Sequence, residues 1–207
     1  MNLVKSYHDY VHVYETNLDL EKLEDSCKKI RDYIVNGLTV QKTGEHNNRT
    51  FKAPITTRVY PDYNLTQFVL DQTHELYEVI TRVSNKHITD WSTNWWTQCW
   101  LNWYEEGEFI HWHNHGISNP KSLHGFVCVH TKDSHTSYQL KDGTEFNVRS
   151  KDGYLMVSQS DGDKHSTQPW EYEQPRITLA FDVAPESEIN PYDFHPNHWT
   201  PLLKLED

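Results

Sequence analysis

Three histidines occupy alternate positions in one short segment of the chain, namely His111, His113 and His115. In an extended segment, side chains two residues apart point to the same face, so these imidazoles would crowd together. Imidazole is the commonest protein ligand for transition metals. His165, about fifty residues downstream in the segment Gly-Asp-Lys-His, would close such a site from a second strand. The histidines therefore predict a metal centre.

Most of the chain from residue 93 onward has the composition and spacing of short strands. Asp-Gly pairs at 142–143, 152–153 and 161–162 mark tight turns between them. The strands that we expect, one of them near the N-terminus, cover residues 7–14, 95–104, 109–115, 124–131, 136–141, 144–149, 153–158 and 175–184.

Two amphipathic helices are expected before this run of strands. The first is capped by Asn17 or Asp19, ends at Gly37 and carries an apolar stripe at steps of three and four residues. The second covers residues 66–84, and its apolar side is formed by Val69, Leu76, Val79, Ile80 and Val83. Helices followed by many short strands predict a mainly β fold with flanking helices, a double-stranded β-helix (jelly roll) packed against N-terminal α-helices.

The whole chain, residues 1–207, is expected to form a single domain. Residues 1–90 would be a helical and β N-terminal part that covers the sheet, and residues 91–185 would be the double-stranded β-helix. Residues 186–207, with three prolines, would form an irregular tail.

Composition argues against several classes of partner. The formal net charge of −11 argues against nucleic-acid binding, which needs clustered Lys and Arg. No run approaches the ~18 apolar residues of a membrane span, and no apolar leader segment is present. Cys27, Cys99 and Cys128 are widely spaced and are expected to be free, buried thiols in a reducing compartment. A cytoplasmic protein is therefore expected.

The metal-site segment resembles a known motif. Tyr104, Gly107 and His113 match the Tyr-x-x-Gly-x5-His-x-Asp pattern of prolyl 4-hydroxylase-like Fe(II)/2-oxoglutarate oxygenases, with His115 at the Asp position. A basic residue, Arg176, follows His165 by 176 − 165 = 11 positions, as in that family. The likeness covers roughly residues 95–184 and is greatest to the small uncharacterised oxygenases frequent in phages and marine bacteria, which would place the protein in a host cytoplasm if it is viral.

The resemblance implies an oxygenase of the hydroxylase type that uses Fe(II), 2-oxoglutarate and O2. By position, His113 and His165 would bind the iron, and Arg176 would pair with the far carboxylate of 2-oxoglutarate. Tyr104 and Asn102 would hydrogen-bond this cosubstrate, and His111 would line its pocket.

His115 departs from the family pattern, because a carboxylate is the usual ligand at its position. Either His115 binds the metal in place of Asp, or it withdraws and leaves an open position, or the centre has been lost. We favour ligation, so that the predicted ligands are His113, His115 and His165. Asp133 and Asp161 are the other carboxylates considered as substitutes, and neither has motif support.

Two other functions compete with this interpretation. A three-histidine site also resembles the cupins, among them dioxygenases and isomerases, although their glutamate is absent from residues 116–122. A catalytically silent jelly-roll binding protein is the third alternative. Arg176 favours the oxygenase, because a cupin has no use for a dicarboxylate anchor there.

The remaining expectations are structural or concern partners. His124, His130 and His135 are expected on the surface, and Trp112 is expected to pack against the layer opposite the histidines. The substrate would be a small molecule or a peptide; its identity and the oligomeric state do not follow from the sequence.

Overall fold

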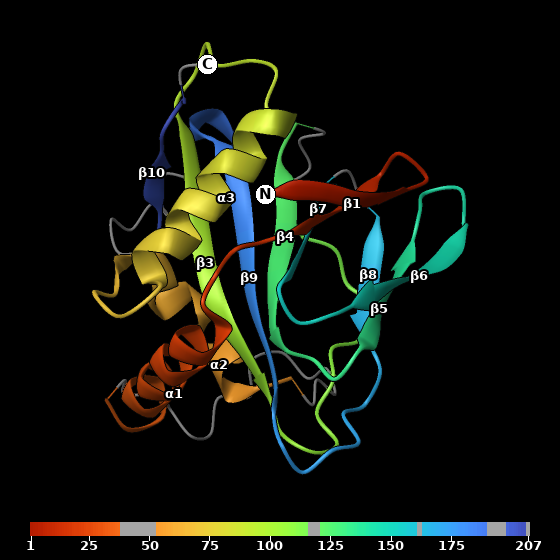
Figure 1. Cartoon of the computed structure of the whole chain (residues 1–207). Helices are drawn as coiled ribbons and strands as arrows, with labels where there is room; N and C mark the ends of the chain where they lie inside the picture. Colours follow the sequence, from red (N-terminus) through yellow and green to blue (C-terminus); the bar gives the residue numbers. More distant parts are fainter. Residues whose placement is uncertain (38–52, 116–120, 161–162, 190–197, 206–207) are drawn as a thin grey trace.

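The computed structural model describes residues 1–37, 53–115, 121–160, 163–189 and 198–205 (Figure 1). Within them the strands form two antiparallel sheets. The larger sheet has the order β1-β2-β7-β4-β9-β3-β10, made of Asn2–Tyr7, Val11–Glu15, Tyr154–Gln159, Leu123–His130, Arg176–Pro185, Trp95–Tyr104 and Thr200–Leu202. The smaller sheet has the order β6-β5-β8, made of Glu145–Ser150, Ser134–Gln139 and Lys164–Thr167.

The helices lie on one side of the large sheet and the small sheet lies on the other (Figure 1). They comprise α1 Leu20–Gly37, α2 Ile55–Arg58 and α3 Thr73–His87, with short 3-10 turns at Tyr60–Asp62, Leu65–Gln67 and Glu186–Glu188. The apolar faces of α1 and α3 join the inner strands in one hydrophobic core. This arrangement confirms the predicted mainly β fold with flanking helices.

Strand β9 is the element on which the site is built. All of its residues are buried, because helices cover one face and the small sheet covers the other. It pairs with β3 in an unbroken register from Trp95 opposite Pro185 to Tyr104 opposite Arg176. Since side chains alternate along a strand, Arg176, Thr178, Ala180 and Asp182 share one face of β9. A single strand thus carries residues to both ends of one cavity.

Gly125 lets β4 pack closely against its neighbours. A Cβ atom at this position would lie 2.4 Å from the carbonyl oxygen of Met156 on β7 and 2.4 Å from the ring of Phe181 on β9. Only glycine leaves room for this approach. The strand holds His124 beside Gly125, opposite Asp182 in the β4–β9 register.

Several predicted elements differ from the observed ones. The first helix is confirmed, but the second begins at Thr73 rather than at residue 66. Gln72 has a left-handed backbone (φ 64°) and Val69, predicted on the apolar side, is 99% exposed. The strand predicted over 7–14 is a hairpin, with positive φ at His8 and Asp9 between β1 and β2.

Two further differences concern the site segment and the tail. Residues 109–115 do not form a strand, and within the described ranges their ladder contact is an isolated bridge between His113 and His165. The tail includes the short strand β10, which pairs with β3, whereas residues 190–197 and the Asp161-Gly162 pair lie outside the described residues. No helix in the described ranges has the length and apolar character needed to cross a membrane.

Candidate metal centre and diacid pocket

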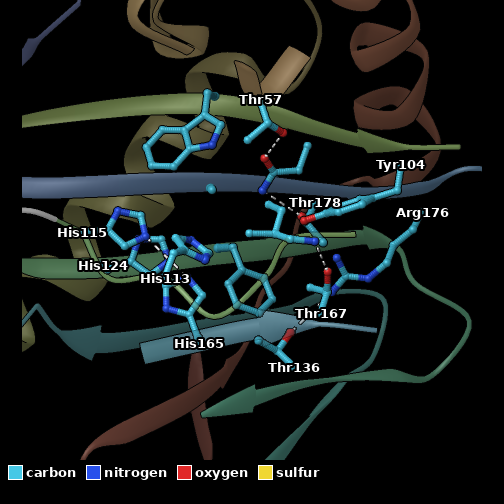
Figure 2. Close-up of a pocket in the computed structure, with 15 residues that line it drawn as sticks. Thr57, Tyr104, His113, His115, His124, Thr136, His165, Thr167, Arg176 and Thr178 are labelled. Carbon is cyan, nitrogen blue, oxygen red and sulfur yellow. Dashed lines mark hydrogen bonds between the residues drawn. The ribbon is translucent and has the colours of Figure 1, made fainter. Parts of the chain in front are cut away.

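A cavity lies between the two sheets and is lined by histidines at one end and by an arginine at the other (Figure 2). Its space is about 420 Å³, including open solvent at the mouth. The polar lining residues at the two ends are His113, His115, His124 and His165, and then Tyr104, Thr136, Thr167, Arg176 and Thr178. Apolar residues, including Ile110, Phe126 and Ala180, form much of the remaining wall.

His113 and His165 are placed side by side by the backbone. Each donates its amide to the carbonyl of the other, at 3.1 and 3.0 Å, and their ring centroids lie 4.3 Å apart. The Nδ1 atom of His113 lies 2.8 Å from the carbonyl oxygen of His111. Because a carbonyl can only accept, this nitrogen carries the proton and Nε2 keeps its lone pair. His113 therefore presents a metal-binding atom.

His115 is held by a carboxylate behind it. Its Nδ1 lies 3.0 Å and 3.1 Å from the two carboxylate oxygens of Asp182. Its Nε2 lies 3.4 Å from the Nε2 of His165. Donation from Nδ1 to the carboxylate leaves a lone pair on Nε2, directed toward His165.

A fourth imidazole, that of His124, belongs to the same cluster. It stacks on His115 with ring centroids 3.6 Å apart, and its Nδ1 donates to Asp182 Oδ1 at 2.9 Å. His124 is only 4% exposed, so the prediction that it lies on the surface is wrong. The reason is that helices and the small sheet bury both faces of β4.

The donor set fits a divalent transition metal. One ligand atom from each of His113, His115 and His165 lies within 4.8 Å of the other two. At this spacing a single cation could contact all three nitrogen atoms. Imidazole nitrogen suits Fe(II) and its first-row neighbours, and the hydrogen bonds at the Nδ1 atoms are of the kind that orients metal-binding histidines. His115, His124 and Asp182 form a second, overlapping group.

Three imidazoles of the cluster, those of His113, His124 and His165, favour the neutral form. Burial, with His115 nearby, lowers the pKa of His113 to about 4 and that of His124 to about 4. Burial and the neighbouring histidines hold the pKa of His165 well below its ordinary value. Burial alone would raise the pKa of the Asp182 carboxyl, but His115 and His124 outweigh this and hold it well below the usual range. Neutral His113 and His165 near an ionised Asp182 are in protonation states that favour metal binding.

Arg176 forms the opposite end of the cavity. It is 4% exposed, and its guanidinium donates to the hydroxyls of Ser134 (3.3 Å) and Thr136 (3.4 Å). It also lies 5.0 Å from the ring centroid of Tyr104. In the described part of the chain, no ion pair joins Arg176 to a carboxylate. A buried charge without a counterion is costly, so this end of the cavity suits an anion.

Tyr104 and Asn102 also lie where an anionic ligand would meet them. Burial raises the pKa of Tyr104, although the charge of Arg176 and hydrogen bonds to Thr167 and Arg176 oppose this, so the phenol keeps its proton. Asn102 accepts from Thr57 Oγ1 at 2.6 Å and donates to Thr178 Oγ1 at 3.4 Å. Asn102 is thus already engaged, and Thr57 of α2 reaches the cavity although no sequence pattern pointed to it.

Other predicted residues lie elsewhere. His111 is exposed and is not among the residues that line the cavity, so the structure gives no support to a role in the cosubstrate pocket. Trp112 is 41% exposed rather than packed in the opposite layer. Asp133 forms an ion pair with Arg149 at 2.9 Å on the surface, whereas a ligand of the histidine cluster would be buried. The three cysteines are free and buried, as predicted.

Comparison with solved structures identifies the fold. A prolyl hydroxylase from Trichoplax adhaerens, in complex with a hypoxia inducible factor oxygen degradation domain peptide fragment, has a TM-score of 0.62 and 11% identity over 87% of this chain and 86% of that one. A Pseudomonas putida prolyl-4-hydroxylase has a TM-score of 0.54 and 13% identity over 83% and 91%. AviO1 from Streptomyces viridochromogenes Tue57 has a TM-score of 0.61 and 14% identity over 84% and 89%.

The chain therefore has a 2-oxoglutarate–Fe(II) oxygenase-like fold. No protein-family model matches the sequence, and no curated protein matches it. At identities of 11–14% the likeness is one of fold. A function for this chain must therefore follow from the residues of the cavity.

Proposed function

We propose that this protein is an Fe(II)- and 2-oxoglutarate-dependent oxygenase of the hydroxylase type. The observation that carries the proposal is that a converging histidine cluster and a buried arginine, which pairs with no carboxylate among the described residues, line the same cavity. A metal-binding group at one end and a guanidinium at the other match the two ends of a 2-oxo diacid. The fold, which is that of known oxygenases, agrees with this assignment.

In this proposal His113, His115 and His165 hold the iron. When bound together, Fe(II) and 2-oxoglutarate activate O2, so that one oxygen atom enters succinate, the other enters a substrate C–H bond, and CO2 is released. The backbone bridge between His113 and His165 positions two of the rings before any ion arrives. Asp182 fixes the third ring, His115, with its Nε2 turned into the cluster.

Arg176 and Tyr104 bind the far carboxylate of 2-oxoglutarate. A guanidinium can donate two parallel hydrogen bonds to a carboxylate, which fixes both the position and the orientation of the diacid. The hydroxyls of Thr136 and Thr178 line the same space and supply further hydrogen-bonding groups. Apolar walls, including Ile110 and Phe126, exclude water and strengthen these charge contacts.

The substrate is proposed to be a small molecule or a peptide. The strongly acidic chain disfavours nucleic acid, and one structural neighbour was solved with a peptide fragment. A cupin-type three-histidine enzyme is less well supported, because it would leave the buried Arg176 without a function.

Turnover without a substrate tests the proposal. The protein is incubated with Fe(II), 2-oxoglutarate and O2, with ascorbate as the source of the two electrons that a substrate would otherwise provide, and succinate is measured. We expect slow formation of succinate that requires Fe(II) and is lost in His165→Ala. Absence of succinate from the wild-type protein under these conditions would argue against the proposal.

A further inference from the structure

Asp182 is a buried carboxylate directly behind the histidine cluster. It is 6% exposed and lies opposite His124 in the β4–β9 register. One carboxylate accepts hydrogen bonds from two imidazoles, at 3.0–3.1 Å from His115 and 2.9 Å from His124. Both rings therefore keep Nδ1 protonated and turn Nε2 away from the carboxylate.

The ligand group itself carries no negative charge. His113, His115 and His165 are neutral donors, so a divalent ion among them would keep its full charge in a buried site. Such a charge is costly unless an opposite charge lies nearby. Asp182 lies close enough to supply such a charge, because its carboxylate contacts the ring of His115.

A carboxylate that accepts from a metal-bound imidazole makes the ring more basic and fixes its orientation. We propose that Asp182, acting through His115, supplies the negative charge that this three-histidine centre lacks, and thereby sets its affinity for the metal. The inference rests on the metal centre of the proposed function. In this arrangement an Asp–His pair stands where a single Asp would bind the ion directly, and Asp182 is a positioning residue rather than a ligand.

Direct ligation by Asp182 fits the contacts less well. A second ion in the group His115, His124 and Asp182 would have to replace the protons that now lie between the Nδ1 atoms and the carboxylate. It would also leave His124 and His115 without the hydrogen bonds that hold their stacked rings. The geometry thus favours one ion per chain, held at the Nε2 side.

The test measures binding of Co(II), titrated into metal-free protein and followed by its visible absorption. Four proteins form a double-mutant cycle: wild type, Asp182→Asn, His115→Asp and the combination of both. Asp182→Asn keeps the shape of the side chain and removes its charge. Asp163→Asn is the matched control, because Asp163 is also buried (7% exposed) and lines a smaller cavity beside His115 and His165.

We expect one Co(II) per chain and a loss of affinity of about 10- to 100-fold in Asp182→Asn, the range typical of such supporting groups. In the His115→Asp background a carboxylate binds the ion directly, so the same Asp182→Asn change should alter affinity by less than about threefold. Asp163→Asn should weaken binding much less than Asp182→Asn, because the inference assigns the effect to the contact between Asp182 and the His115 ring. A merely structural role for Asp182 would give equal losses in both backgrounds.

Three results would overturn the inference while leaving the metal centre intact: unchanged affinity in Asp182→Asn, equal losses in both backgrounds, or two Co(II) per chain. No Co(II) binding by the wild type would overturn the proposed metal centre and the inference with it. If circular dichroism shows that Asp182→Asn does not fold, the Co(II) affinity of Asp182→Glu tests the inference instead. This variant keeps the charge and should bind Co(II) within about fivefold of wild type, and a thirtyfold loss would contradict the inference.

Discussion

His113 and His165 exchange both of their backbone hydrogen bonds, although they lie in segments far apart in the sequence. Two further hydrogen bonds lie next to this bridge: the amide of Ile110 donates to Thr167 Oγ1, and the carbonyl of Ile110 accepts from the amide of Thr167. The backbone therefore fixes the separation of the two rings before a ligand is present. A site prepared in this way spends little binding energy on ordering its ligands.

Metal binding should stabilise the folded protein in a histidine-dependent way. At a hundredfold excess over Kd, a ligand of the native state adds about 2.7 kcal/mol, which for a chain of this size raises Tm by roughly 5–10 °C. Mn(II) should produce this shift in the wild type and not in His113→Ala or His165→Ala. His135→Ala, an exposed histidine on β5, is the control and should behave as wild type. A full shift in His165→Ala would contradict the ligand assignment.

Stability of the metal-free protein should depend on pH in a defined window. The pKa of His113 and of His124 falls from 6.5 in the unfolded chain to about 4 in the folded protein. Between these values the unfolded state binds more protons, so stability is complete above pH 6.5 and is lost as pH falls toward 4. Denaturation at several pH values should show a loss of at least about 2 kcal/mol over this interval. A flat profile would mean that these rings are not buried as described.

Arg176 should control the requirement for 2-oxoglutarate. Loss of a charge-assisted bidentate contact costs about 2–3 kcal/mol, so Arg176→Gln should raise the 2-oxoglutarate concentration for half-maximal succinate formation by more than tenfold. Arg149→Gln is the matched control, since Arg149 pairs with Asp133 on the surface. Equal requirements in both variants would remove Arg176 from the diacid pocket.

Gly125 should be among the least replaceable residues of the large sheet. Gly125→Ala places a Cβ atom against the backbone of Met156 and the ring of Phe181, which we expect to cost about 2–3 kcal/mol of unfolding free energy. Gly107→Ala is the comparison: its φ is +80° but nothing lies within 4 Å of the added atom, so only about 1 kcal/mol of backbone strain is expected. Urea denaturation measures both, and a smaller loss at Gly125 would refute the packing argument.

The sequence predicts best those elements whose apolar residues recur at a regular spacing. Helix α1 has an apolar stripe bounded by a cap and a glycine, so its position followed directly. The predicted second helix begins too early, because Val69 matches the apolar spacing of the helix although this part of the chain still forms turns. A hydrophobic pattern cannot show that Gln72 takes up a left-handed conformation and delays the start of the helix.

The sequence predicts part of the candidate site, namely the residues whose regular spacing places them together. Spacing brought His113, His115 and His165 together, and the structure adds His124 and Asp182 to them. The alternation of polar and apolar residues does not indicate the burial of these two residues, because both lie on central strands whose two faces are covered. A signal was nonetheless present: a histidine and an aspartate inside otherwise apolar runs are buried and therefore need partners.

The most direct test of the central proposal is an anaerobic titration of the Fe(II)-loaded protein with 2-oxoglutarate, followed by visible absorption. If histidines hold iron at one end of the cavity and Arg176 seats a diacid at the other, a charge-transfer band should appear. It should saturate at one 2-oxoglutarate per chain and require much higher concentrations in Arg176→Gln. Iron-loaded wild-type protein that develops no such band would contradict the oxygenase assignment.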